Sequence, residues 1–321
     1  MIKLSRVSKM INPMYILLSG FLGGTIPFFM YMGNFPVSRQ PYGLQFTHAL
    51  SFTTWVFLLC VLFSVISVIL IPGWKVCHDL FLLVVHPGRH KSWKVIGVLV
   101  TSTVMYGLVL LALFSVADRL LRLPSSDFVN ELSHRFNVVY AYSALGFLPV
   151  MFSIILINYI AEGMSVDIPV VSDDEKKTME FIQTYLDYRT ILQICLVTSG
   201  IILSLNPIIT AAFASIWREI GVFTDETFPS QSIIIYGLAF TLILILIYVP
   251  TYFNLTNAGR ELRNARYPYP QRLDELKSVM EKRKTLDELL QTNISITENL
   301  KNGIFTLSPL VSGLIAGLLG F

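Results

Sequence analysis

Residues 190–217 read TILQICLVTSGIILSLNPIITAAFASIW and contain no charged side chain. An α-helix rises about 1.5 Å per residue, so roughly 20 apolar residues are needed to cross a hydrocarbon layer about 30 Å thick. A helix of a water-soluble protein rarely runs this far without one charge on its outer face. The segment therefore predicts a transmembrane helix.

Five further segments have the same character: residues 14–32, 49–71, 95–117, 137–161 and 232–252. They predict an all-α fold, a polytopic membrane bundle of about six transmembrane helices within residues 1–260. Residues 261–303 are expected to form a cytoplasmic helical tail. The apolar segment 304–321 contains Pro309 and three glycines. We expect it to span thinly, to lie at the membrane interface, or to pack on the bundle.

Composition agrees with this fold class. Hydrophobic residues make up 54% of the 321 residues and charged residues 14%, with a mean hydropathy of +0.63. A soluble domain carries roughly 25% charged residues. The net charge of +3 gives no reason to expect nucleic acid as a partner. The three cysteines, Cys60, Cys77 and Cys195, are too scattered for a disulfide framework.

The Lys and Arg residues predict the orientation. Of these 24 residues, 19 lie in the N-terminal segment, in the second and fourth loops, or after the sixth run, and 5 lie in the other loops. Positive loops stay in the cytoplasm, so the N-terminus and the tail are expected there, in a bacterial inner membrane or a plasma membrane. Aromatic residues near the run ends fit an interfacial belt: Tyr31, Trp74, Trp93, Trp217, Tyr248 and Tyr252.

Three structured pieces are predicted outside the bilayer. Pro72-Gly73 and Pro87-Gly88 bracket residues 74–86, which indicate a short interfacial helix. The sequence from Ser172 to Glu175 matches a capping box, and the helix it opens is expected to continue into the fifth span. The tail carries an apolar stripe that favours a partner-binding helix: Leu273, Leu276, Met280, Leu286 and Leu290.

Signatures of catalysis are absent from the sequence, which has no phosphate-binding glycine loop, zinc-protease motif or nucleophile elbow. The predicted spans carry no acid or base at depth, which argues against ion-coupled pumping and intramembrane proteolysis. We therefore expect no enzymatic activity and no cofactor. His86 and His90, with Cys77 and His78, match no standard metal site, so lipid headgroup contact is favoured and no metal is expected.

Proline in the fifth span offers a candidate cavity. Pro207 frees a backbone carbonyl near Leu203, and Asn206 places an amide at mid-depth. One interpretation is a cavity-lining face made by Leu203, Asn206, Pro207 and Thr210. The other is a structural kink, with Asn206 bonded to a neighbouring helix.

Two Gly-x-x-x-Gly pairs, Gly20 with Gly24 and Gly313 with Gly317, predict close helix–helix contact. The contact could be between subunits of a homo-oligomer or within one bundle.

Three functions remain open on the sequence. The first is a non-enzymatic, channel-like or membrane-permeabilising protein. The second is a membrane scaffold or sensor whose cytoplasmic helices bind a protein partner. The third is a facilitator-type transporter of an uncharged or lipid-like solute. All three take the lipid bilayer as a partner.

Overall fold

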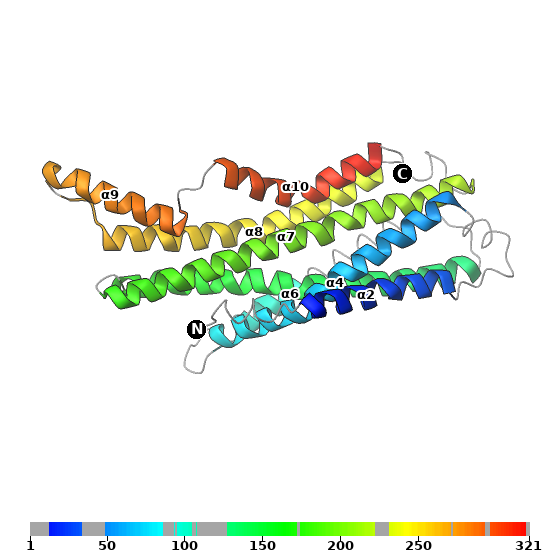
Figure 1. The fold of residues 1–321 in the computed structure, drawn as a ribbon, viewed down its shortest axis with the longest axis horizontal. Helices are drawn as coiled ribbons and strands as arrows, with labels where there is room; N and C mark the ends of the chain where they lie inside the picture. Colours follow the sequence, from blue (N-terminus) through cyan, green and yellow to red (C-terminus); the bar gives the residue numbers. More distant parts are fainter. Residues whose placement is uncertain are drawn as a thin grey trace.

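The computed structural model describes residues 13–33, 49–85, 93, 95–104, 107, 127–171, 174–221, 231–270, 272–292 and 296–318, and these form helices without a strand (Figure 1). The helices, in chain order, are α2 (Pro13–Phe28), the π-helical η1 (Phe29–Gly33), α4 (Leu50–Val84), α6 (Asp127–Val171), α7 (Glu175–Glu219), α8 (Gln231–Arg266), α9 (Leu273–Leu290) and α10 (Ile296–Leu318). The predicted all-α fold is confirmed.

Among the described residues, five helices are long and apolar enough to cross a membrane: Pro13–Met32, Leu50–Val84, Ala141–Val166, Glu175–Glu219 and Gln231–Arg266. They correspond to the first, second, fourth, fifth and sixth predicted runs. Within the third run, residues 95–117, the structure describes the short apolar helix Val95–Val104 and Gly107. The rest of that run lies outside the described residues.

The long helices lie side by side and pass well beyond the predicted spans (Figure 1). α6 and α7 each have 45 residues. At 1.5 Å per residue that is about 65 Å, roughly twice the thickness of a hydrocarbon core. We call one end of the bundle the α9 end. It holds α9, the C-terminal parts of α4, α6 and α8, and the N-terminal part of α7.

The predicted interfacial helix at residues 74–86 is wrong, because α4 continues through Pro72 and Gly73 to Val84. Proline removes one helical hydrogen bond, but packing can offset that loss. Beyond Pro72 the helix buries Cys77, Leu80 and Val84 in the core. α4 packs along both α6 and α7.

The helix predicted to open near Ser172 and to run into the fifth span is confirmed as α7. Its capping residue is Asp174, whose carboxylate accepts from the backbone N–H groups of Lys176 (2.9 Å) and Lys177 (3.2 Å). The predicted cap, Ser172, lies outside the described residues. Aspartate satisfies the free N–H groups of a helix start as well as serine does.

The residues predicted to form an aromatic belt differ in their exposure. Trp74 and Trp93 are exposed, but Tyr31, Trp217 and Tyr248 are buried inside the bundle. At the end opposite to α9 the buried rings pack in a chain, with centroid distances of 4.8 Å from Tyr31 to Trp55 and 5.4 Å from Trp55 to Phe213. Edge-on and tilted pairs of this kind stabilise a helix interface beyond the area they bury.

Polar bonds between helices fix α6 against α8. The Asn254 amide donates to the Asn158 amide oxygen at 2.9 Å, and the Thr251 hydroxyl lies 3.3 Å from the Ile154 carbonyl oxygen. In an apolar medium such pairs favour one particular register of two helices.

Candidate functional site

Two regions of the structure carry features beyond simple packing. The first is the α9 junction, which we define as Arg189, Arg263, Arg283, Asp287 and Thr292. It lies where α9 folds back on the ends of α7 and α8, after a turn that contains Pro268 and Pro270. Two closely spaced prolines disfavour helical backbone in the residues before them, and α8 ends at Arg266, where the chain reverses (Figure 1).

An ion pair ties α9 to α8. Arg263 Nη1 donates to both carboxylate oxygens of Asp287, at 2.9 and 2.7 Å. The Asp287 side chain is 7% exposed. The Thr292 hydroxyl donates to Asp287 Oδ1 at 2.5 Å, which adds a third hydrogen bond. A carboxylate held by several donors and shielded from water is costly to leave without its cation.

Arg283 makes a second tie to the end of α8. Its guanidinium donates to the Tyr267 carbonyl at 2.5 Å and to Asn264 Oδ1 at 2.6 Å. The same group lies 4.0 Å from the centre of the Tyr269 ring, within cation–π range. Arg283 therefore contacts the residues at which the chain reverses direction after α8.

Arg189 supplies the contact from α7. Its side chain is 4% exposed, and Nη1 donates to the Leu290 carbonyl at 3.2 Å. That carbonyl belongs to the last turn of α9, where a cation is favoured. Gly259 on α8 lets the helices meet closely, because an added Cβ would lie 2.8 Å from Thr292 Cγ2 and 3.0 Å from the Tyr185 hydroxyl.

The predicted stripe of α9 divides at this junction. Leu286 and Leu290 are buried in the main core, while Leu276 is half-buried and Met280 is 49% exposed. The side chain of Leu273 lies outside the described residues. The stripe was expected to be buried against another subunit, the fourth loop of this chain or the membrane surface. Its C-terminal half is covered by this chain's own helices, including the part of α7 that belongs to the predicted fourth loop.

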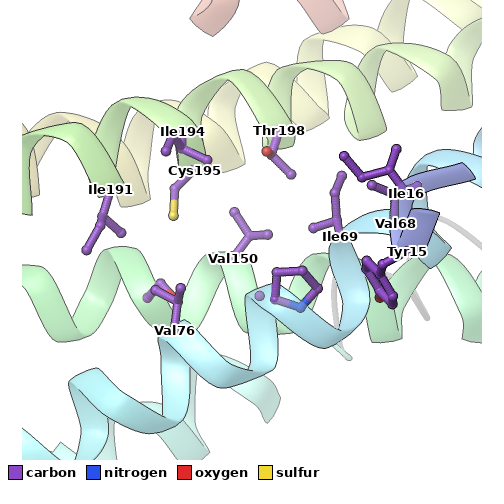
Figure 2. Close-up of a pocket in the computed structure, with 13 residues that line it drawn as sticks. Tyr15, Ile16, Val68, Ile69, Val76, Val150, Ile191, Ile194, Cys195 and Thr198 are labelled. Carbon is purple, nitrogen blue, oxygen red and sulfur yellow. The ribbon is translucent and has the colours of Figure 1, made fainter. Parts of the chain in front are cut away.

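The second region is the lateral crevice, a cavity of about 170 Å³ between four helices (Figure 2). Its lining residues come from α2, α4, α6 and α7: Tyr15, Ile16, Val68, Ile69, Pro72, Gly73, Val76, Val150, Ser153, Ile191, Ile194, Cys195 and Thr198. Gly73 provides part of the space, since it has no side chain opposite Pro149 of α6.

The wall of the crevice is mainly apolar. None of its lining residues is charged. The Ser153 hydroxyl donates to the Pro149 carbonyl at 2.7 Å, and the Tyr15 hydroxyl to the Ser67 carbonyl at 3.3 Å. The protons of these two hydroxyls are therefore donated to backbone, and the third hydroxyl of the lining belongs to Thr198.

The residues predicted to line a cavity in the fifth span lie further along α7 and do not line the crevice. Leu203 and Pro207 are buried. The half-buried Asn206 donates its amide to the Ile202 carbonyl of its own helix at 2.9 Å, and the Thr210 hydroxyl donates to the Asn206 carbonyl at 2.9 Å. The structural interpretation expected the Asn206 amide to bond to a neighbouring helix. That expectation is wrong, because the amide bonds within α7.

The glycine pairs lie at contacts within the chain. An added Cβ would lie 3.4 Å from Val68 Cγ2 at Gly20 and 2.5 Å from Ser64 Oγ at Gly24, both on α4. At Gly313 it would lie 3.2 Å from the Gly237 Cα on α8. Gly317 is half-buried. The C-terminal apolar segment thus forms α10, which packs on α7 and α8.

Among the residues that the structure describes, no group of three His, Cys, Asp or Glu side chains is placed to hold a metal ion. His86 and His90 lie outside that part of the chain. Comparison with protein-family models, curated proteins and solved structures finds no match to this chain.

The sequence contains only part of the signal for the α9 junction and the lateral crevice. The basic and acidic residues of α9 were visible, but the pairing of Arg263 with Asp287 depends on the chain reversal at Pro268 and Pro270. The crevice was missed because Pro72-Gly73 was interpreted as the end of a helix. A Pro-Gly pair between two apolar stretches, residues 49–71 and 80–85, is the signal that could have indicated it.

Proposed function

We propose that this chain is an integral membrane scaffold or sensor. Its five apolar helices cross the bilayer, and its α9 end stands in the cytoplasm and binds a protein partner. The observation that carries the proposal is the α9 junction, where three buried or half-buried arginines hold a helix in one position on the projecting ends of α7 and α8.

Membrane insertion is supported by the outer faces of the helices. Phe21 of α2 is 71% exposed, Phe57 of α4 is 64% exposed and Leu246 of α8 is 72% exposed. Large apolar patches of this kind are rare on soluble monomers. Each such side chain contributes roughly 1.5–3 kcal/mol when it is transferred from water to an apolar environment.

Partner binding is supported by the outward surface of α9. Met280 is exposed beside the charged residues Lys277 and Lys284, and Leu289 is exposed on another side of the helix, about half a turn away around its axis. Methionine and leucine within a charged surface are typical of sites that bind a helix or a loop of another protein. The junction gives this surface a fixed orientation, which lowers the entropy lost on binding.

A channel receives less support from the geometry. The polar groups that motivated it, on Asn206 and Thr210, donate to carbonyls of their own helix. The facilitator hypothesis rests on neutral polar residues, and the crevice hydroxyls that have assigned partners also bond to backbone.

Site-specific photo-crosslinking tests the proposal. A photoreactive amino acid is placed at Met280 or Leu289 in cells that express the full chain, with Leu246 on the apolar face of α8 as the control position. We expect a discrete protein adduct from α9 and none from Leu246. An adduct of twice the chain mass would identify the partner as a second copy. No adduct from α9, together with ion conductance of the purified chain in a bilayer, would overturn the scaffold in favour of the channel.

A further inference from the structure

The lateral crevice joins the outside of the bundle to its core. At its edge, Ile194 is 52% exposed, while Val150 and Cys195 deeper in are 4% and 7% exposed. Figure 2 shows these side chains converging from facing helices. A ligand could therefore enter from the side of the bundle, without passing through either end.

The position of the crevice across the bilayer follows from the predicted spans. Its α2 residues begin the first span (14–32), its α4 residues end the second (49–71), and its α7 residues begin the fifth (190–217). All three are the ends that the Lys and Arg distribution assigns to the cytoplasm. The α6 residues of the crevice, Val150 and Ser153, lie near the middle of the fourth span (137–161), so on this topology the crevice extends from the cytoplasmic membrane surface toward the bilayer centre.

We infer that the lateral crevice binds one acyl chain of a cytoplasmic-leaflet phospholipid; this rests on the membrane insertion in the proposed function. The apolar exterior at its mouth is continuous with Ile16 and Ile194, so in a bilayer the surrounding medium is acyl chain. An empty cavity would lose dispersion contacts along its whole lining. The volume of 170 Å³ compares with about 150 Å³ for a buried apolar cavity that holds one benzene ring, so a short run of methylene groups fits.

The same lining argues against a polar ligand. The crevice offers no charged side chain, and two of its three hydroxyls, those of Ser153 and Tyr15, donate to backbone carbonyls; the third belongs to Thr198. The phosphate headgroup therefore stays outside, at the membrane surface, and only the chain enters. The crevice therefore binds the acyl chain of the lipid and not its headgroup.

The test uses the purified full chain in phosphatidylcholine vesicles that contain a small fraction of phosphatidylcholine with a diazirine on one acyl chain. Photolysis and mass spectrometry locate the adducts. We expect adducts at Val150 or Cys195, which bulk lipid does not reach, in addition to adducts at the lipid-facing Leu246. Val76→Phe, which fills the crevice, should reduce the core adducts severalfold, and Val311→Phe on the exposed face of α10 should not.

Thr198→Phe fills the crevice from the α7 side and serves if Val76→Phe does not fold. Core adducts that persist in a folded filled variant would overturn the assignment. Labelling of Leu246 without labelling of Val150 or Cys195 would show an inserted chain with no lipid in the crevice, which overturns this inference alone. Absence of labelling at Leu246 as well would overturn the proposed membrane insertion, and the inference with it.

Discussion

Arg263 and Asp287 face each other across the α8–α9 turn, with Arg263 Nη1 2.9 and 2.7 Å from the two carboxylate oxygens. Both side chains are largely shielded from solvent. The pair links the last turns of a long apolar helix to a short polar one. It is one of the contacts that determine where α9 lies, and the first prediction follows from it.

Replacement of Asp287 by Asn should release α9, because Arg263 then loses its carboxylate in a shielded site. We expect a local loss of roughly 2–3 kcal/mol. That corresponds to a drop of roughly 30- to 150-fold in the hydrogen-exchange protection of α9 amides. Lys284→Gln removes a surface pair in which Nζ lies 3.9 Å from Glu288, and it should leave protection unchanged. Equal protection in both variants would mean that the pair does not hold α9.

Glu219, in the last turn of α7, caps the N-terminus of α4. Its carboxylate accepts from Leu50 N at 2.7 Å and from Ser51 N at 3.2 Å. Because this caps free N–H groups, Glu219→Ala should cost about 1 kcal/mol of stability in detergent. Thermal unfolding measures the loss. Glu261→Ala, an exposed glutamate within α8, should have a smaller effect, and a reversed order would refute the cap.

Gly237 lets α10 approach α8. An added Cβ there would clash with the Pro309 carbonyl, so backbone must move. Gly237→Ala should therefore lower stability by about 1–3 kcal/mol, as overpacking does. Gly303→Ala is the matched control, because an added Cβ there meets nothing within 4 Å. Unchanged unfolding in Gly237→Ala would mean that α10 is not packed against α8.

Cysteines at Leu203, Asn206 and Thr210 distinguish a packed fifth span from a water-filled one. Cys60, Cys77 and Cys195 are first replaced by alanine. Since the Asn206 amide and the Thr210 hydroxyl bond within α7, we expect no reaction with a membrane-impermeant thiol reagent in intact membranes. Reaction at these three positions but not at Leu205 or Ile208 would restore the channel hypothesis.

The sequence predicted the helices well where the signal was local. Long charge-free runs gave five of the apolar helices among the described residues, and the capping box from Ser172 to Glu175 marked the start of α7, although the capping residue in the structure is Asp174. Predictions that depended on tertiary contacts failed more often. Pro72-Gly73 was interpreted as a helix end, since the packing of Leu80 and Val84 that carries α4 past it involves distant helices.

The candidate sites show the same division. The hydrophobic stripe on α9 was visible from its spacing, but the half that is covered by α7 and α8 was not. Trp217 was placed at the membrane interface because it ends a run, yet it packs with Phe213 at 5.9 Å inside the bundle. The crevice arises between four separate segments, so no stretch of sequence contains it.

Cysteine labelling at the two ends of the bundle tests the central claim most directly. In a chain without native cysteines, Lys277→Cys lies on α9 and Gln231→Cys at the start of α8, at the opposite end (Figure 1), and both positions are exposed. In sealed cells, a membrane-impermeant maleimide should label Gln231→Cys at once and Lys277→Cys only after permeabilisation. Equal labelling of both cysteines in sealed cells would contradict a chain that crosses the membrane with its α9 end in the cytoplasm.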